Sequence, residues 1–177
     1  PTHYVKFYSK KGYELTNVAP IDPADDGLHL RKLRCGALCG DTYYGYICRV
    51  FTFVDQPNQF VSIDFNTGKV NVIHQFEFTD EWPTIYEMAY DRERKTCWAL
   101  ARGTRDYATS DVYEINTTDG SFSRVAELDY YAWAMAVDYD GNAYVIKGKP
   151  DSKNEYYEGS YLVKLDVDED FASVDST

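Results

Sequence analysis

Short runs in which apolar and polar residues alternate recur along the chain, each followed by a polar turn and a second run. The clearest copies are residues 60–73, 112–125 and 161–174. Alternation with a period of two places one side of a strand on the core and the other side in solvent. Each of these segments therefore predicts a β-hairpin.

The turns of these hairpins recur at nearly constant spacing. Gly68 and Gly120 are 52 residues apart, and Asp170 takes the same place 50 residues further on. A fourth copy at residues 4–15 puts Gly12 at the turn, 56 residues before Gly68. Glycine suits such turns because it adopts positive φ without a Cβ clash. A spacing of about 50 residues indicates an internal structural repeat.

A second type of hairpin precedes each of the last three copies. It covers residues 86–101 and 133–146, in which Asp91 and Asp138 match at a spacing of 47 residues. In the earliest and loosest copy, Asp41 is the counterpart of Asp91. The repeat unit is thus four antiparallel strands, with no helical periodicity between them.

A four-stranded meander of this length is the unit of a β-propeller blade. We therefore expect an all-β fold, a β-propeller of which this chain holds about three and a half blades, as a single domain over residues 1–177 or a fragment of one. An open β-sandwich built from the same hairpins is the alternative. The predicted blade parts are residues 4–20, 28–78, 84–128 and 133–177.

Several phrases of the repeat resemble a known group of proteins. Met88-Ala-Tyr-Asp, Ala136-Val-Asp-Tyr-Asp-Gly-Asn-Ala-Tyr-Val and Tyr113-Glu-Ile-Asn-Thr-Thr-Asp-Gly are similar to segments of NHL-type and related YVTN β-propellers. The resemblance covers roughly residues 4–171 and bears on the fold more than on an activity. Many such proteins are exported by bacteria, so it implies an extracellular, cell-surface or periplasmic location.

The expected number of blades is too small for a closed ring, because propellers usually have four to eight. The chain also begins at Pro1 rather than Met, which suggests a processed product or part of a longer protein. We expect either a fragment of a larger propeller or a ring that a second chain completes.

Loop lengths favour one end of the predicted blades as the binding end. Turns within the hairpins are tight, whereas the connections at residues 50–58, 102–110 and 148–159 are long. Alternating strand direction brings these long loops and the connections between blades to the same end, and long loops on a rigid scaffold commonly bind ligands. The candidate residues there are Trp82, Arg102, Arg105, Tyr107, Tyr130, Tyr131, Trp133, Tyr156 and Tyr157.

These nine residues are the predicted ligand-binding residues. Trp and Tyr rings combine a flat apolar face with a polar edge, which suits a glycan, a peptide or a protein partner. The alternative is that the rings cap the blade core. We expect this more for Trp133, which lies beside a strand, than for Tyr156 and Tyr157 in a polar loop.

The net charge of -11 narrows the range of partners. Nucleic acids and anionic membranes both favour basic surfaces, so we expect neither as a partner. No apolar run approaches the ~20 residues that span a bilayer as a helix. Asp22, Asp25 and Asp26 could offer oxygens to Ca²⁺, but the spacing of a calcium-binding loop is absent. We expect solvated turn carboxylates and no cofactor.

Catalytic groups are sparse. Of the three histidines, His3, His29 and His74, only His29 lies near the loop-rich end, and His74 fits a packed strand position. No nucleophile elbow or phosphate-binding loop is present. We therefore expect a non-catalytic binding module. The alternatives are a calcium-dependent propeller hydrolase or lyase using His29 and Asp26, and a purely structural half-propeller.

The four cysteines lack the spacing of a zinc site. Cys35 and Cys48 could face each other across the first four-stranded unit's leading hairpin and form a disulfide. Cys39 aligns with Ala89, which predicts a small buried side chain.

Overall fold

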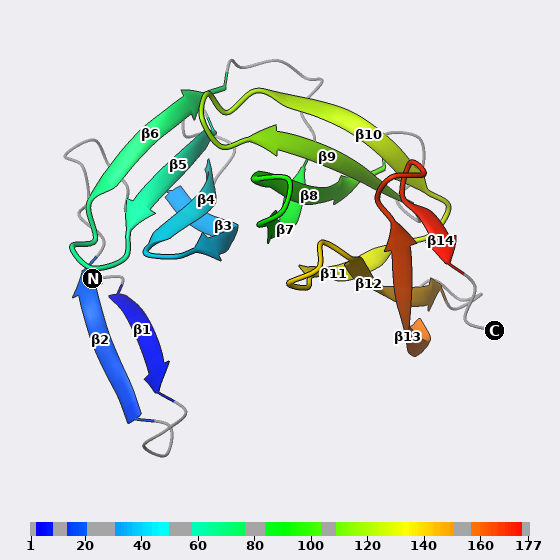
Figure 1. Ribbon diagram of the computed structural model, residues 1–177, viewed down its shortest axis with the longest axis horizontal. Coiled ribbons are helices and arrows are strands. Elements are labelled where there is room, and N and C mark those ends of the chain that lie inside the picture. The colour runs from blue at the N-terminus through cyan, green and yellow to red at the C-terminus, as the bar shows by residue number, and fades with distance from the viewer. Residues whose placement is uncertain are drawn as a thin grey trace. The chain divides into compact units, whose positions relative to one another are not determined.

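The computed structural model describes residues 3–8, 14–20, 31–49, 58–76, 84–103, 109–150 and 157–174. These residues form fourteen β-strands, β1 to β14, and none of them is helical (Figure 1). The chain divides into two compact units, residues 1–78 (unit 1) and residues 79–177 (unit 2), each with its own sheets.

Unit 1 contains two antiparallel sheets. One pairs β1 with β2, and the other has the order β3-β4-β5-β6, in which each strand pairs with the next along the chain. The strands are β1 (His3–Tyr8), β2 (Glu14–Pro20), β3 (Arg31–Cys39), β4 (Thr42–Arg49), β5 (Gln59–Asp64) and β6 (Val70–Gln75).

Unit 2 contains two four-stranded antiparallel sheets with the orders β7-β8-β9-β10 and β11-β12-β13-β14, and the first strands of the two sheets, β7 and β11, contact each other. The strands are β7 (Ile85–Asp91), β8 (Thr96–Arg102), β9 (Ser110–Asn116), β10 (Phe122–Leu128), β11 (Ala132–Val137), β12 (Ala143–Pro150), β13 (Tyr157–Asp166) and β14 (Ala172–Val174).

The fold class expected from the sequence is confirmed. The described residues are all-β, and three four-stranded meanders follow one two-stranded sheet. This is the make-up of about three and a half blades, consistent with a partial β-propeller. That all four sheets belong to a single domain stays a prediction.

All three four-stranded sheets have a β-bulge at the same place in their first strand. The residues within the bulges are Arg34 in β3, Tyr86 in β7, and Trp133 with Ala134 in β11. A bulge adds a residue to one strand and turns its side chain away from the regular alternation. The repeat therefore places one redirected side chain near the start of the first strand of each sheet.

Counting from these bulges corrects part of the sequence alignment. Cys39, Asp91 and Asp138 each follow the bulge residue of their own sheet by five positions. Cys39 therefore matches Asp91 and not Ala89, and the match of Asp41 with Asp91 is wrong. The cause is a shorter turn: two residues separate β3 from β4, whereas four separate β7 from β8.

The disulfide considered between Cys35 and Cys48 is also wrong. In the β3–β4 pairing, Cys35 lies opposite Tyr46 and Cys48 lies opposite Lys32, so the two cysteines are not neighbours across the hairpin. Cys35 is a buried thiol. The turn between β3 and β4 sets this register, which pairs Cys35 with Tyr46 two residues before Cys48.

The turns that link the third and fourth strands are equivalent, as the sequence predicted. Gly68 and Gly120 have φ values of 74° and 71°, and each donates its backbone N–H to the carbonyl four residues earlier, on Asp64 and Asn116. Asp170 holds the matching place in the last sheet with φ of 50°. Positive φ at all three positions explains the glycines.

The core of unit 2 lies between its two sheets. Leu100 and Val112 project from one sheet and Val145 and Leu165 from the other, and all four are at most 1% exposed. Each fully buried side chain of this size stabilises the fold by about 1.5–3 kcal/mol relative to an exposed one. A smaller cluster in unit 1 joins Ile47, Val61 and Ile63.

Replacing Gly36 with alanine should destabilise unit 1 by about 1–3 kcal/mol, because the added Cβ would meet the backbone carbonyl oxygen of Tyr44 and the ring of Tyr43. Urea unfolding followed by far-UV circular dichroism measures the change. Gly40→Ala, in the same hairpin, has nothing within 4 Å of its Cβ but keeps the strain of φ at 58°. Equal losses in the two variants would contradict the steric explanation.

Candidate functional site

The structure describes the side chains of four of the nine predicted ligand-binding residues: Arg102, Tyr130, Tyr131 and Trp133. The backbone of Tyr157 lies on β13, opposite Pro150. The other predicted residues lie outside the described residues, namely Trp82, Arg105, Tyr107 and Tyr156.

Three rings gather where β7 and β11 begin. Tyr131 stacks on Tyr86 with ring centroids 5.4 Å apart, and the rings of Tyr131 and Trp133 are nearly perpendicular with centroids 5.0 Å apart. Trp133 remains 44% exposed. We call Tyr86, Tyr131 and Trp133 the aromatic cluster.

Tyr86 was not among the predicted residues. Its place in the bulge of β7 is the counterpart of Trp133 in the bulge of β11. The spacing of 47 residues that relates Asp91 to Asp138 also relates Tyr86 to Trp133, so the repeat carried the signal.

A closed set of hydrogen bonds holds Tyr86 in place. Its hydroxyl donates to the carbonyl of Ala132 at 2.7 Å, so the 2.7 Å contact with Ser110 has the serine hydroxyl as donor. Ser110 Oγ in turn accepts the backbone N–H of Ala132 at 2.9 Å. Burial raises the pKa of Tyr86 well above its usual value, although the hydrogen bond from Ser110 opposes this, so the phenol stays protonated.

Tyr130 and Arg102 occupy different environments. Tyr130 is only 5% exposed and belongs to the core of unit 2, which is the alternative considered for these rings, and Lys147 Nζ lies 4.2 Å from the centre of its ring. Arg102 is exposed at the end of β8, and its charge acts on Tyr86 to favour the ionised form slightly. Lys147 and Arg102 are thus two cationic side chains near the aromatic cluster.

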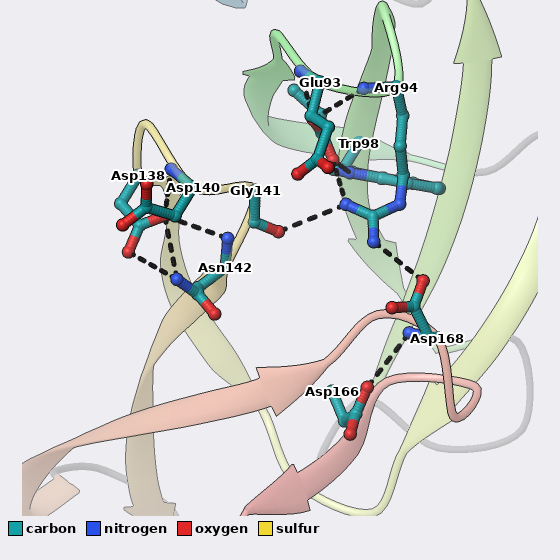
Figure 2. Close-up of polar contacts among 10 residues, drawn as sticks. Glu93, Arg94, Trp98, Asp138, Asp140, Gly141, Asn142, Asp166 and Asp168 are labelled. Carbon is teal, nitrogen blue, oxygen red and sulfur yellow. Dashed lines mark hydrogen bonds and ion pairs between the residues drawn. The ribbon is translucent and has the colours of Figure 1, made fainter.

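A second polar arrangement lies at the opposite ends of these strands, among the turns of the two sheets of unit 2 (Figure 2). Arg94 extends from the β7–β8 turn to the carbonyl of Gly141 at 3.3 Å and to Asp168 at 2.7 Å. It also pairs with Asp91 at 3.0 Å. Arg94 therefore ties three turns together.

Asp91 is the buried centre of this arrangement. Its Oδ1 accepts the backbone N–H groups of Glu93 and Arg94, and its Oδ2 accepts Trp98 Nε1 at 3.2 Å as well as the Arg94 guanidinium. Asp138 caps the equivalent turn in the next sheet through Asn142. The sequence match of Asp91 with Asp138 is confirmed.

An open pocket of about 430 Å³ lies beside Arg94. Glu93, Asp140, Asp166 and Lys164 contribute to its walls. Within the described parts of the chain, no group of three or more His, Cys, Asp or Glu side chains could hold a metal ion. The arrangement there can fix the turns of two sheets relative to each other.

The residues proposed for calcium and for catalysis are mostly outside the described part. Asp22, Asp25, Asp26 and His29 all fall in a range that the structure does not describe. His74 lies on β6 with its ring centroid 4.8 Å from that of Phe76, as expected for a packed strand residue. Among the residues that the structure does describe, no helix is long and apolar enough to cross a membrane.

Comparison with known proteins adds two structural similarities. A protein described as a "putative exo-beta-1,3-galactanase" from Bifidobacterium bifidum shares 15% identity over 77% of this chain and 49% of its own, with a TM-score of 0.47. Oligogalacturonate lyase from Vibrio parahaemolyticus shares 11% identity over 97% of this chain and 59% of its own, with a TM-score of 0.46.

This chain spans 49% and 59% of the lengths of those two proteins. Both TM-scores are below 0.5, so neither similarity assigns an activity to the chain. No protein-family model matches the sequence, and no curated protein matches it either. The resemblance to NHL-type and YVTN propellers therefore stays a prediction.

Proposed function

We propose that the chain is a non-catalytic binding module that uses the aromatic cluster of unit 2 to bind a glycan. The observation that carries this proposal is the ring of Trp133, which is 44% exposed and packs at a near-perpendicular angle against Tyr131, which itself stacks on the anchored Tyr86. Such a ring offers a flat apolar face to the C–H groups of a sugar and a polar edge to its hydroxyls.

Rigidity is the main physical support. Ordering a ligand-binding side chain on contact costs about 0.5–1.5 kcal/mol, and a ring that is already fixed avoids that cost. The hydrogen bonds among Tyr86, Ser110 and Ala132 fix the base of the cluster before any ligand arrives. Arg102 could add a charged contact to an acidic sugar.

Trp133→Ala should weaken glycan binding at least about tenfold, because truncating a central aromatic contact typically costs more than about 1–2 kcal/mol. A glycan array with the full chain identifies the ligand, and titration calorimetry with the strongest hit measures the affinity. Trp133→Phe should retain part of the affinity because a flat ring remains.

Tyr139→Ala is the matched control for that prediction. Tyr139 is 82% exposed and lies on the β11–β12 turn, away from the aromatic cluster, so its loss should leave the affinity unchanged. The proposal would be contradicted by an array without any glycan signal. It would also be contradicted if Trp133→Ala and the unchanged chain bound the glycan with equal affinity. Signals on a peptide array instead would replace the glycan with a peptide ligand.

We extend the proposal to location and cofactor. The resemblance to exported propellers favours a place outside the cell, on its surface or in the periplasm, which fractionation of cells expressing the full-length protein tests. Binding by stacked rings needs no metal ion, so EDTA should leave the glycan affinity unchanged. A loss of affinity in EDTA would instead favour the calcium hypothesis built on Asp22, Asp25 and Asp26.

A further inference from the structure

The turn between β9 and β10 contains a sequence pattern that the proposed function does not use. Residues 116–118 read Asn-Thr-Thr, and Asn-x-Ser/Thr without proline is the pattern at which N-linked glycans are attached in secreted proteins. No other asparagine in the sequence has Ser or Thr two positions later. A pattern this short also arises by chance, so the structure of the turn decides whether Asn116 suits the role.

The same kind of turn occurs in three sheets, and a carboxylate or amide side chain caps it each time. Asp64, Asn116 and Asp166 hold equivalent places, each four residues before a residue with positive φ. Their Oδ1 atoms accept the backbone N–H two residues later, at 2.9 Å for Asp64, 2.8 Å for Asn116 and 3.1 Å for Asp166. Aspartate therefore caps this turn as well as asparagine does, and the cap does not account for the amide at position 116.

The residue two positions after the cap also departs from the repeat. Thr118 stands where the other two sheets have Asn66 and Asp168. Thr118 is exposed, and its hydroxyl has no hydrogen-bond partner within the residues that the structure describes. The turn thus gives this hydroxyl no structural role, whereas the glycosylation pattern requires it. The two positions that differ from the repeat are the two that define the pattern.

The amide nitrogen of Asn116 is available for attachment. Asn116 is exposed, and its Oδ1 accepts the N–H of Thr118, which leaves Nδ2 as the atom of the amide that the cap does not use. Its backbone bonds to Gly120 and Ser121 do not use Nδ2 either. Over the described part of the chain, Nδ2 has no hydrogen-bond partner, so a glycan attached to it breaks no hydrogen bond of the turn.

We propose that Asn116 is an N-glycosylation site. In the transfer, Nδ2 attacks the anomeric carbon of a lipid-linked glycosyl pyrophosphate, and a C–N bond forms. The bond from that carbon to the pyrophosphate oxygen breaks, the pyrophosphate leaves with the electron pair, and one of the two Nδ2 protons passes to a base of the transferase.

This inference rests on the proposed location outside the cell and is independent of glycan binding. Asn116 ends β9, whereas Ser110, which bonds Tyr86 of the aromatic cluster, begins it. At about 3.3 Å per strand residue, the two ends are roughly 20 Å apart. A glycan attached at Asn116 therefore begins well away from the aromatic cluster.

Secretion of the full chain from eukaryotic cells, with a signal peptide added, tests the site. Intact-mass measurement should show one N-linked glycan per chain, which peptide N-glycosidase removes while converting Asn116 to aspartate. The added signal supplies the secretory route, so this result does not depend on the natural location of the protein. The fractionation experiment given above tests that location separately, so the two failures are distinguishable.

Asn116→Asp and Thr118→Ala should each abolish the modification and keep the melting temperature. Aspartate retains the oxygen that caps the turn, as it does in two equivalent turns, and Thr118→Ala removes an exposed hydroxyl without a partner. Thr118→Ser keeps the hydroxyl and should keep the glycan. A secreted chain without a glycan overturns the inference, and so does a glycan that persists in Asn116→Asp or Thr118→Ala.

Discussion

Replacing Asp91 with alanine is expected to destabilise unit 2 by about 3–5 kcal/mol, the range seen when one partner of a buried ion pair is removed. The Asp91 side chain is fully buried, and its loss leaves Trp98 Nε1 and the N–H groups of Glu93 and Arg94 without their acceptor. All three tryptophans belong to residues 79–177, so intrinsic fluorescence during urea unfolding follows this unit.

Asp168→Ala is the matched control for Asp91→Ala, because both remove a carboxylate that pairs with Arg94. The Asp168 side chain is 79% exposed, and an exposed pair contributes about 1 kcal/mol or less. A large loss for Asp168→Ala together with a small loss for Asp91→Ala would show that burial is not the decisive quantity.

The Asp91 carboxylate also makes the stability of unit 2 sensitive to acid. Burial alone would raise the pKa of Asp91, but the hydrogen bonds from the Arg94 backbone, Trp98 and the Arg94 guanidinium outweigh it, so the pKa lies below its usual value. A depressed pKa adds stability above the unfolded-state value of about 3.9, and that stability disappears as pH falls through the folded-state pKa. Asp91→Asn should lose less stability between pH 5 and pH 2 than the unchanged chain, since it has no such proton to gain.

The repeat and its hairpins could be predicted from the sequence because they rest on local rules. Alternating residues marked the strands, and the turn residues Gly68 and Gly120 sit at positive φ where glycine is favoured. Asp170 was placed in the same turn by spacing alone and has the same sign of φ. Local conformational preference and periodicity sufficed for these features.

The bulges could not be predicted, because nothing in a period of two marks where one extra residue interrupts the pairing. Counting Cys39 against Ala89 failed because the turn after β3 has two residues and the turn after β7 has four; only the bulges, which lie at the same place in both sheets, reveal the correct match. An alignment error of two positions keeps a residue on the same side of a strand, so the alternation of apolar and polar residues does not reveal the error.

The sequence also could not predict which of the aromatic rings at residues 130–133 are exposed to solvent. Tyr130 and Trp133 are three residues apart in one aromatic stretch, yet Tyr130 is a core residue and Trp133 is exposed. Which ring faces solvent depends on the packing of β11 against β7, a contact between residues about 47 positions apart. The aromatic composition identified residues 130–133 as a candidate binding segment, but tertiary packing determines which of its rings is buried and which is exposed.

Tyr86→Ala is expected to destabilise unit 2 by about 3 kcal/mol, because it removes a half-buried ring and opens a cavity beneath Tyr131. The variant also loses the hydroxyl that bonds the Ala132 carbonyl and accepts from Ser110. Tyr86→Phe keeps the stack on Tyr131 and should cost only about 1 kcal/mol. Urea unfolding followed by tryptophan fluorescence measures both changes.

A double-mutant cycle of Tyr86→Phe with Ser110→Ala separates the hydrogen-bond set from the ring. Ser110→Ala alone should cost about 1–3 kcal/mol, since the buried N–H of Ala132 loses its acceptor. Because the two hydroxyls bond each other, the paired change should cost less than the sum of the single changes, with a coupling of about 0.5 kcal/mol or more. Additive losses would mean that Tyr86 and Ser110 act independently, and the aromatic cluster would then lack the fixed base on which tight ligand stacking depends.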